Sequence, residues 1–134
     1  MRVVFDTHIL ISALVIGGQA EEAMARVIKG TDRLLLSQAI VDELLTVLAR
    51  KFGRDREPLA RLALFLDEVA EQVQPDEPLD ILSDEPDNRI LECAVAGDAD
   101  AIITGDHSML ALGRYRKITI MSLKLYLEPN LEEN

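Results

Sequence analysis

Short hydrophobic runs alternate along the chain with longer segments of helical periodicity. The runs are three residues or so in length and end at polar residues or glycine, which is typical of buried strands. Strands are predicted at residues 3–5, 34–36, 101–103 and 118–120, with a short one at Val73. Helices are predicted at residues 9–15, 20–28, 37–52, 58–70 and 86–96, with a short one from Ser122. Strands separated by helices indicate βαβ units and a parallel sheet.

Length and composition fit one folded domain over residues 1–134. Hydrophobic residues make up 49% of the chain and charged residues 28%, which argues against disorder and coiled coils. The single Cys93 excludes an intramolecular disulfide framework and a multi-cysteine zinc site, and it favours a reducing cytoplasm. The apolar stretch at residues 9–16 is far shorter than the ~20 residues of a membrane-spanning helix, so no membrane association is expected.

The charge is strongly acidic but unevenly spread. There are 14 basic and 24 acidic residues, a net charge of −10, which taken alone argues against a nucleic-acid partner. Residues 1–66 carry a net +1, however, and residues 67–134 carry −11. Basic residues in the first half cluster at Arg50, Lys51 and Arg54, which could guide RNA or could be ordinary solvated side chains.

Two acids follow predicted strands directly. Asp6 comes after residues 3–5, and Asp106 follows Thr104-Gly105 after residues 101–103. Ligands of open parallel sheets bind beyond the carboxyl ends of the strands, so both acids are expected at one edge. Each also has a structural reading, since Asp6 could cap the helix that follows and Asp106 a turn beginning at His107.

Helical spacing adds two further acids. Asp87 points along the apolar stripe of its predicted helix, where an isolated carboxylate needs a cation, a capping role or a proton. Glu43 lies on the border of the apolar stripe in the predicted helix 37–52, whereas Asp42 lies nearly opposite. Several carboxylates at one edge repel one another unless a cation neutralises them, and oxygen ligands without cysteine or paired histidine favour Mg²⁺ or Mn²⁺.

Four segments in this order resemble the motifs of the PIN-domain family. Residues 3–10 are similar to the family's opening of strand, Asp, Thr and Asn, and residues 37–48 with Glu43 are similar to its second motif. Residues 84–94 resemble the third motif, and residues 101–106 the fourth, with the Thr-Gly-Asp ending found in a toxin branch. The order and spacing match over nearly the whole chain.

The resemblance implies a Rossmann-like three-layer α/β/α sandwich with a parallel sheet of about five strands. It also implies a metal-dependent ribonuclease acting on single-stranded RNA, of the VapC-like kind that a cognate antitoxin holds inactive and that is often a homodimer. By motif position, Asp6, Glu43, Asp87 and Asp106 would be the catalytic and metal-binding acids, with Thr7 and Thr104 as supporting residues.

His8 departs from the family pattern, which has Asn at this position. A ring nitrogen of His8 could replace the amide's hydrogen bond, add a metal ligand or spoil the site. The alternative function is therefore a binding or regulatory module that keeps the fold without catalysis. A phosphatase or phosphoacceptor domain is a weaker third hypothesis, since such a phosphatase would need an acid where His8 stands.

Overall fold

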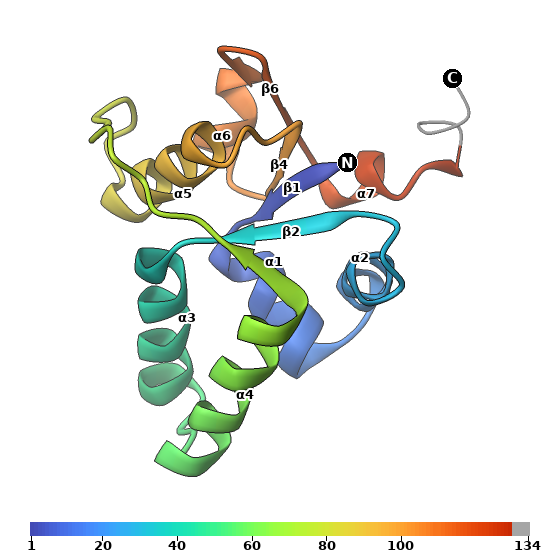
Figure 1. Ribbon diagram of the computed structural model, residues 1–134, viewed down its shortest axis with the longest axis vertical. Coiled ribbons are helices and arrows are strands. Elements are labelled where there is room, and N and C mark those ends of the chain that lie inside the picture. The colour runs from blue at the N-terminus through green and yellow to red at the C-terminus, as the bar shows by residue number, and fades with distance from the viewer. Residues whose placement is uncertain (130–134) are drawn as a thin grey trace.

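A mostly parallel sheet of six strands forms the centre of the computed structural model, which describes residues 1–129 (Figure 1). The spatial order is β3-β2-β1-β4-β6-β5, and only β5 is antiparallel to its neighbour, β6. The strands are β1 (Arg2–Phe5), β2 (Arg33–Leu36), β3 (Ala70–Gln72), β4 (Ala101–Ile103), β5 (Arg114–Tyr115) and β6 (Ile118–Met121). Val4 and Ile102 pair in the middle of the sheet and are fully buried, as hydrophobic strands covered on both faces should be.

Helices cover both faces of the sheet, which makes the molecule a three-layer α/β/α sandwich. Figure 1 shows α5 and α6 on one face and α1, α2 and α4 on the other. The helices are α1 (Thr7–Ile11), a π-helical turn η1 (Ser12–Ile16), α2 (Gln19–Ile28), α3 (Gln38–Lys51), α4 (Arg56–Val69), α5 (Glu85–Ala96), α6 (His107–Leu112) and α7 (Leu123–Tyr126). The predicted fold class, with about five parallel strands, is confirmed.

Helix α3 lies between the two helical layers and contacts both α1 and α5. Ser37 caps it as predicted, since its hydroxyl accepts from the Ile40 amide at 3.3 Å. Ile40, Leu44 and Leu48 recur every four residues and are buried, so this face of α3 is fixed against the core. Another side of α3 is therefore free to line a pocket that the helix shares with α1 and α5.

The structure departs from the predicted elements where runs are short. The strand predicted at Val73 lies earlier, at Ala70–Gln72, although the Val73 amide still donates to the Leu36 carbonyl at 2.8 Å. Helix α6 and the two-residue strand β5 were not predicted, because six and two residues carry too little periodicity. The first helix begins two residues earlier than expected and widens into the π-helical turn before Gly17.

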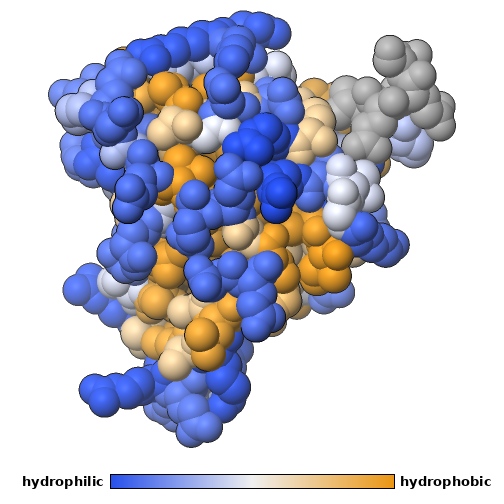
Figure 2. All heavy atoms as spheres, in the orientation of Figure 1, coloured by the Kyte–Doolittle hydropathy of each residue, from blue (hydrophilic) through white to orange (hydrophobic). Residues whose placement is uncertain are grey.

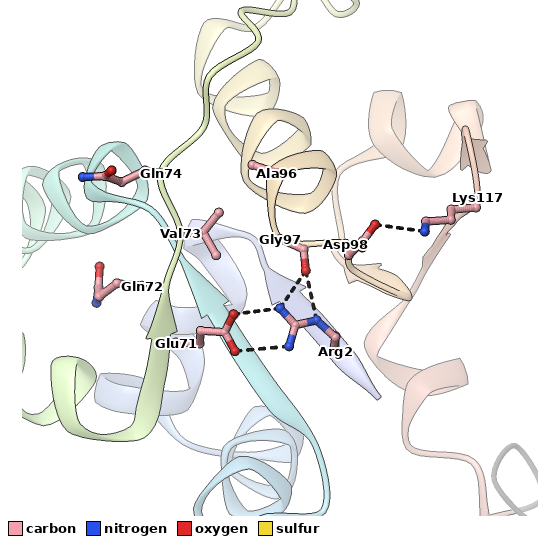
Figure 3. Close-up of a pocket in the computed structure, with 9 residues that line it drawn as sticks. All are labelled: Arg2, Glu71, Gln72, Val73, Gln74, Ala96, Gly97, Asp98 and Lys117. Carbon is pink, nitrogen blue, oxygen red and sulfur yellow. Dashed lines mark hydrogen bonds and ion pairs between the residues drawn. The ribbon is translucent and has the colours of Figure 1, made fainter.

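Arg2 joins three elements at the amino-terminal end of the sheet. Its guanidinium forms two hydrogen bonds with Glu71 in β3, at 3.1 and 2.8 Å, and donates to the carbonyl of Gly97 after α5 (Figure 3). The same bonds lower the pKa of Glu71 below its usual range. Edge strand β3 is thereby tied to the central strand and to the end of the helix above it.

Apolar surface remains exposed away from this end. Figure 2 shows it gathered over the part of the molecule where α1 and α4 lie. Among the large hydrophobic side chains, the most exposed include Ile16, at 66%, and Leu64, at 65%. Within residues 1–129, no helix is long and apolar enough to cross a membrane.

Candidate active site

Five carboxylates line one small pocket at the carboxyl ends of the central strands, and they come from the starts of α1, α5 and α6 and from α3. The pocket has a volume of about 140 Å³ and lies between the starts of α1, α5 and α6 and one border of α3. We call it the acidic pocket. Its charged and polar lining residues are Asp6, Thr7, His8, Glu43, Lys51, Asp84, Asp87 and Asp106.

Asp6 is buried, with 4% of its surface exposed, at the junction of β1 and α1. Its Oδ1 accepts from the Ile9 amide at 2.9 Å and so caps α1, while its Oδ2 accepts a short hydrogen bond from the Thr104 hydroxyl. The Asp6 amide in turn donates to the Ile103 carbonyl at 3.1 Å. These bonds fix the carboxylate against β4, the neighbouring strand.

Thr104 connects Asp6 to Asp106 from beneath the pocket. Its side chain is fully buried, and its hydroxyl oxygen accepts from the Asp106 amide at 3.0 Å while the proton goes to Asp6. Asp106 caps α6 by accepting from the Met109 amide at 3.0 Å. The two acids that follow β1 and β4 are therefore oriented by one hydroxyl and by their own helices.

Asp87 carries the clearest electrostatic perturbation in the pocket. Burial raises its pKa to about 6, with further contributions from the charges of Asp106, Asp84 and Asp6. Its Oδ2 is buried and accepts no hydrogen bond from any residue within 1–129. A buried carboxylate oxygen without a partner is unusual in a native protein, and a bound cation would satisfy it.

Glu43 and Lys51 lie on one border of α3. They are eight residues apart, with Val47 between them, and all three line the acidic pocket. Glu43 is half-buried whereas Asp42 is exposed, as their positions around the helix predicted. Thr7 is half-buried in the first turn of α1, and the neighbouring His8 is exposed at the rim.

The residues of the acidic pocket fit a divalent cation by their chemistry. The pKa of Asp87 is raised by burial and by its acidic neighbours, and one of its oxygens has no partner, so positive charge would stabilise its ionised form. Hard oxygen ligands of this kind suit Mg²⁺ or Mn²⁺. Within residues 1–129, however, no three acidic, histidine or cysteine side chains already stand close enough to hold a metal ion.

Two predicted residues lie outside the pocket, and one residue was missed. Arg54 instead lines an apolar recess with Leu14 and Leu48, and Arg50 is exposed farther along α3. Asp84 was not singled out, although it precedes α5 at its N-cap position and lines the pocket. Its spacing of three residues from Asp87 places both acids at the start of one helix, which is the signal that could have found it.

A larger hollow at the opposite end of the sheet holds none of the predicted site residues. It measures about 500 Å³ and includes Arg2, Glu71, Asp98 and Lys117. Figure 3 shows these charged side chains paired with one another, Arg2 with Glu71 and Lys117 with Asp98. Charges satisfied in this way support the fold and leave no unpaired group for a ligand.

Comparisons with known proteins agree with the motifs. A family model described as a PIN domain matches residues 2–108. The structure is similar to VapBC2 from Rickettsia felis bound to a DNA fragment from its promoter, with a TM-score of 0.64 at 15% identity over 91% of this chain and 98% of that one. It is also similar to VapBC-1 from nontypeable Haemophilus influenzae, with a TM-score of 0.63 at 20% identity over 92% and 99%. No curated protein matches the sequence.

Proposed function

Because the chain belongs to the PIN-domain family, we propose that it is a metal-dependent endoribonuclease of single-stranded RNA and the toxin of a toxin–antitoxin pair. The observation that carries the proposal is the acidic pocket. Asp6, Glu43, Asp87 and Asp106 line it together, and the Oδ2 of Asp87 has no hydrogen-bond partner within residues 1–129. The proposal treats residues 1–134 as one PIN-like domain.

In the proposed mechanism, these four acids hold Mg²⁺ or Mn²⁺. When bound, the ion supplies charge neutralisation at phosphate oxygens and a water molecule of lowered pKa. The Thr104 hydroxyl keeps the Asp6 carboxylate facing the pocket by donating to it. No side-chain nucleophile would then be required, since the oxygen of water would bond to the phosphorus while one phosphorus–oxygen bond to ribose breaks and the departing ribose oxygen takes up a proton.

Basic residues on α3 would hold the RNA. Lys51 lines the pocket beyond Glu43, so its ammonium can pair with a phosphate near the scissile one. Arg50 and Arg54 lie near it in sequence and are exposed, which suits contacts to more distant phosphates. Thr7 and His8 complete the rim, where a hydroxyl and an imidazole can hydrogen-bond to substrate.

The proposal includes two protein partners, a cognate antitoxin and a second copy of the chain. The similar structures come from VapBC systems, and the net charge of −10 suits a partner segment that is basic. Exposed apolar side chains such as Ile16 and Leu64 give such partners a surface to cover. The proposed setting is the cytoplasm.

Substitution Asp6→Asn tests the nuclease. The purified variant should lose Mn²⁺-dependent cleavage of a single-stranded RNA by at least about 100-fold, because the amide removes a charged ligand while keeping the size of the side chain. A gel assay of labelled RNA, run beside a DNA of the same sequence, measures the loss. Full activity in Asp6→Asn would place the cleavage elsewhere or in a contaminant.

His8 favours the alternative, a PIN-like module that binds without cleaving, and His8→Asn separates the two functions. If the exposed imidazole has spoiled the site, restoring the family's usual Asn should create cleavage that the natural chain lacks. Equal cleavage by both proteins would reject the degenerate module.

A further inference from the structure

A second recess opens beside the acidic pocket and shares lining residues with it. Its volume is about 150 Å³, and it lies between the first turns of α3 and α5. Thr7, Glu43, Pro86 and Ile90 line both hollows, so a ligand in one lies next to a ligand in the other. We call this second hollow the side recess.

The side recess has apolar walls and a few charged groups. Ala39 and Ile40 contribute from α3, and Pro86 and Ile90 from α5. Among its lining residues, the charged ones are Glu43, Glu85 and Arg89. Apolar walls with a few polar groups are typical of a site that orients a flat organic ligand.

Arg89 brings a hydrogen-bond donor that nothing accepts. One terminal nitrogen of its guanidinium donates to Glu85 at 3.3 Å, and the other contacts Glu92 at 3.0 Å and the Leu79 carbonyl at 3.3 Å. These bonds hold the preceding loop to α5. The Nε–H is buried, and no residue within 1–129 accepts its hydrogen bond. An acceptor that reached this nitrogen would satisfy it.

The charges in the recess favour a neutral ligand over a phosphate. Glu43 and Glu85 together outweigh the single positive charge of Arg89, so a phosphate would be repelled. A neutral nucleobase avoids this repulsion and can use the carboxylates as acceptors. The adjoining acidic pocket is where the proposed function places the scissile phosphate, and a base attached to that backbone lies within reach.

We propose that the side recess binds a guanine base next to the scissile phosphate and so sets the sequence preference of cleavage. This inference rests on the proposed nuclease function. Guanine presents two adjacent acceptors, O6 and N7, which are the usual partners of arginine. Its Watson–Crick edge also presents neighbouring N–H donors that match a carboxylate. No other RNA base offers both pairs.

Cleavage of four RNAs tests the preference. The RNAs are identical except for one internal nucleotide in a cytidine background, and kcat/KM is measured with Mn²⁺ for each. The guanosine RNA should be cut beside that nucleotide about tenfold faster than the others, or more. Ala39→Leu, which fills the recess from an exposed position, should bring the guanosine RNA down to the level of the others. Ala49→Leu, the same exposed change farther along α3, should preserve the preference.

A nucleotide-binding experiment tests the side recess even if the protein cleaves no RNA. Guanosine monophosphate, added to metal-free protein, should shift the NMR signal of the Arg89 Nε–H, which an Arg89→Lys spectrum assigns. Adenosine, cytidine and uridine monophosphates should not shift it, and Ala39→Leu should abolish the effect while Ala49→Leu retains it. Cleavage without base preference and without this shift would overturn guanine binding in the side recess but not the nuclease function. A guanosine-specific shift without any cleavage would overturn the nuclease and leave the recess standing.

Discussion

At the scale of single residues, the same side chains cap helices and line the acidic pocket. Asp6 and Asp106 could each be explained from sequence as a helix cap, and both do cap a helix. The caps fix where the carboxylates point, which is what a preorganised site requires. The sequence could therefore predict both acids. The family resemblance also named Thr104 as a supporting residue, but the sequence could not predict that its hydroxyl joins the two acids, because those partners are decided by the pairing of β1 with β4.

Asp87 should make stability depend on pH. Its pKa is about 6 in the folded protein, well above the value of an exposed Asp, so the native state holds a proton that the unfolded state has released. Stability is therefore lost as the pH rises from about 4 through 6. This loss is absent in Asp87→Asn. Between pH 4.5 and 7.5, the free energy of unfolding of the variant should therefore rise by about 1–2 kcal/mol relative to that of the natural protein, after allowance for solvent screening.

Urea unfolding of both proteins across that pH range measures the gain, with the exposed Asp67→Asn as the matched control. A constant difference between Asp87→Asn and the natural protein would contradict the raised pKa. Millimolar Mn²⁺ at pH 7.5 should raise the melting temperature of the natural protein more than that of Asp87→Asn, since the cation binds the ionised carboxylate.

At the scale of elements, long periodic helices were predictable and short segments were not. The predicted helix 86–96 differs from α5 by one residue, because its apolar stripe and its final glycine are both clear in the sequence. Helix α6 has only six residues, and the π-helical turn after α1 has no distinct pattern. The start of β3 at Ala70 depends on where α4 stops and on the pairing of its strand with β2.

Gly97 ends α5 against the sheet and tolerates no side chain. A Cβ there would lie 2.7 Å from Leu35 Cδ1 and 3.0 Å from Val73 Cγ2, both on or beside the packed strands. We expect Gly97→Ala to lower the free energy of unfolding by about 1–3 kcal/mol through overpacking. Gly105→Ala is the control, because a Cβ at that position meets no atom within 4 Å. Equal stability of the two variants in urea would contradict the close packing.

At the scale of the whole molecule, the net charge alone is a poor guide to the proposed RNA substrate. The acidic excess lies in the second half of the sequence and includes two of the four acids of the proposed metal site, Asp87 and Asp106, whereas Asp6 and Glu43 lie in the first half. The basic residues of α3 lie in the nearly neutral first half. Their sequence cluster predicted an edge for RNA, but only the fold places Lys51 at the pocket while leaving Arg50 and Arg54 outside it.

Lys51→Ala should weaken RNA binding in a salt-dependent way. In the Asp6→Asn background with Mg²⁺, where RNA stays intact, the slope of log K against log salt should fall by about 0.7 for the one lost phosphate contact. Fluorescence anisotropy with a labelled single strand measures the slope. Lys29→Ala removes the same charge from an exposed position at the end of α2 and should leave the slope unchanged. Equal slopes for both variants would remove Lys51 from the RNA path.

The bond between Thr104 and Asp6 spans 98 positions of the chain. On the ribosome, β1 therefore emerges long before β4, the central strand that lies beside it in the sheet. Asp106 at the start of α6 leaves the exit tunnel later still, whereas Asp87 of α5 emerges before β4. The acidic pocket therefore cannot assemble on the ribosome until β4 and the start of α6 have emerged, so the proposed nuclease stays inactive while the residues before them are translated.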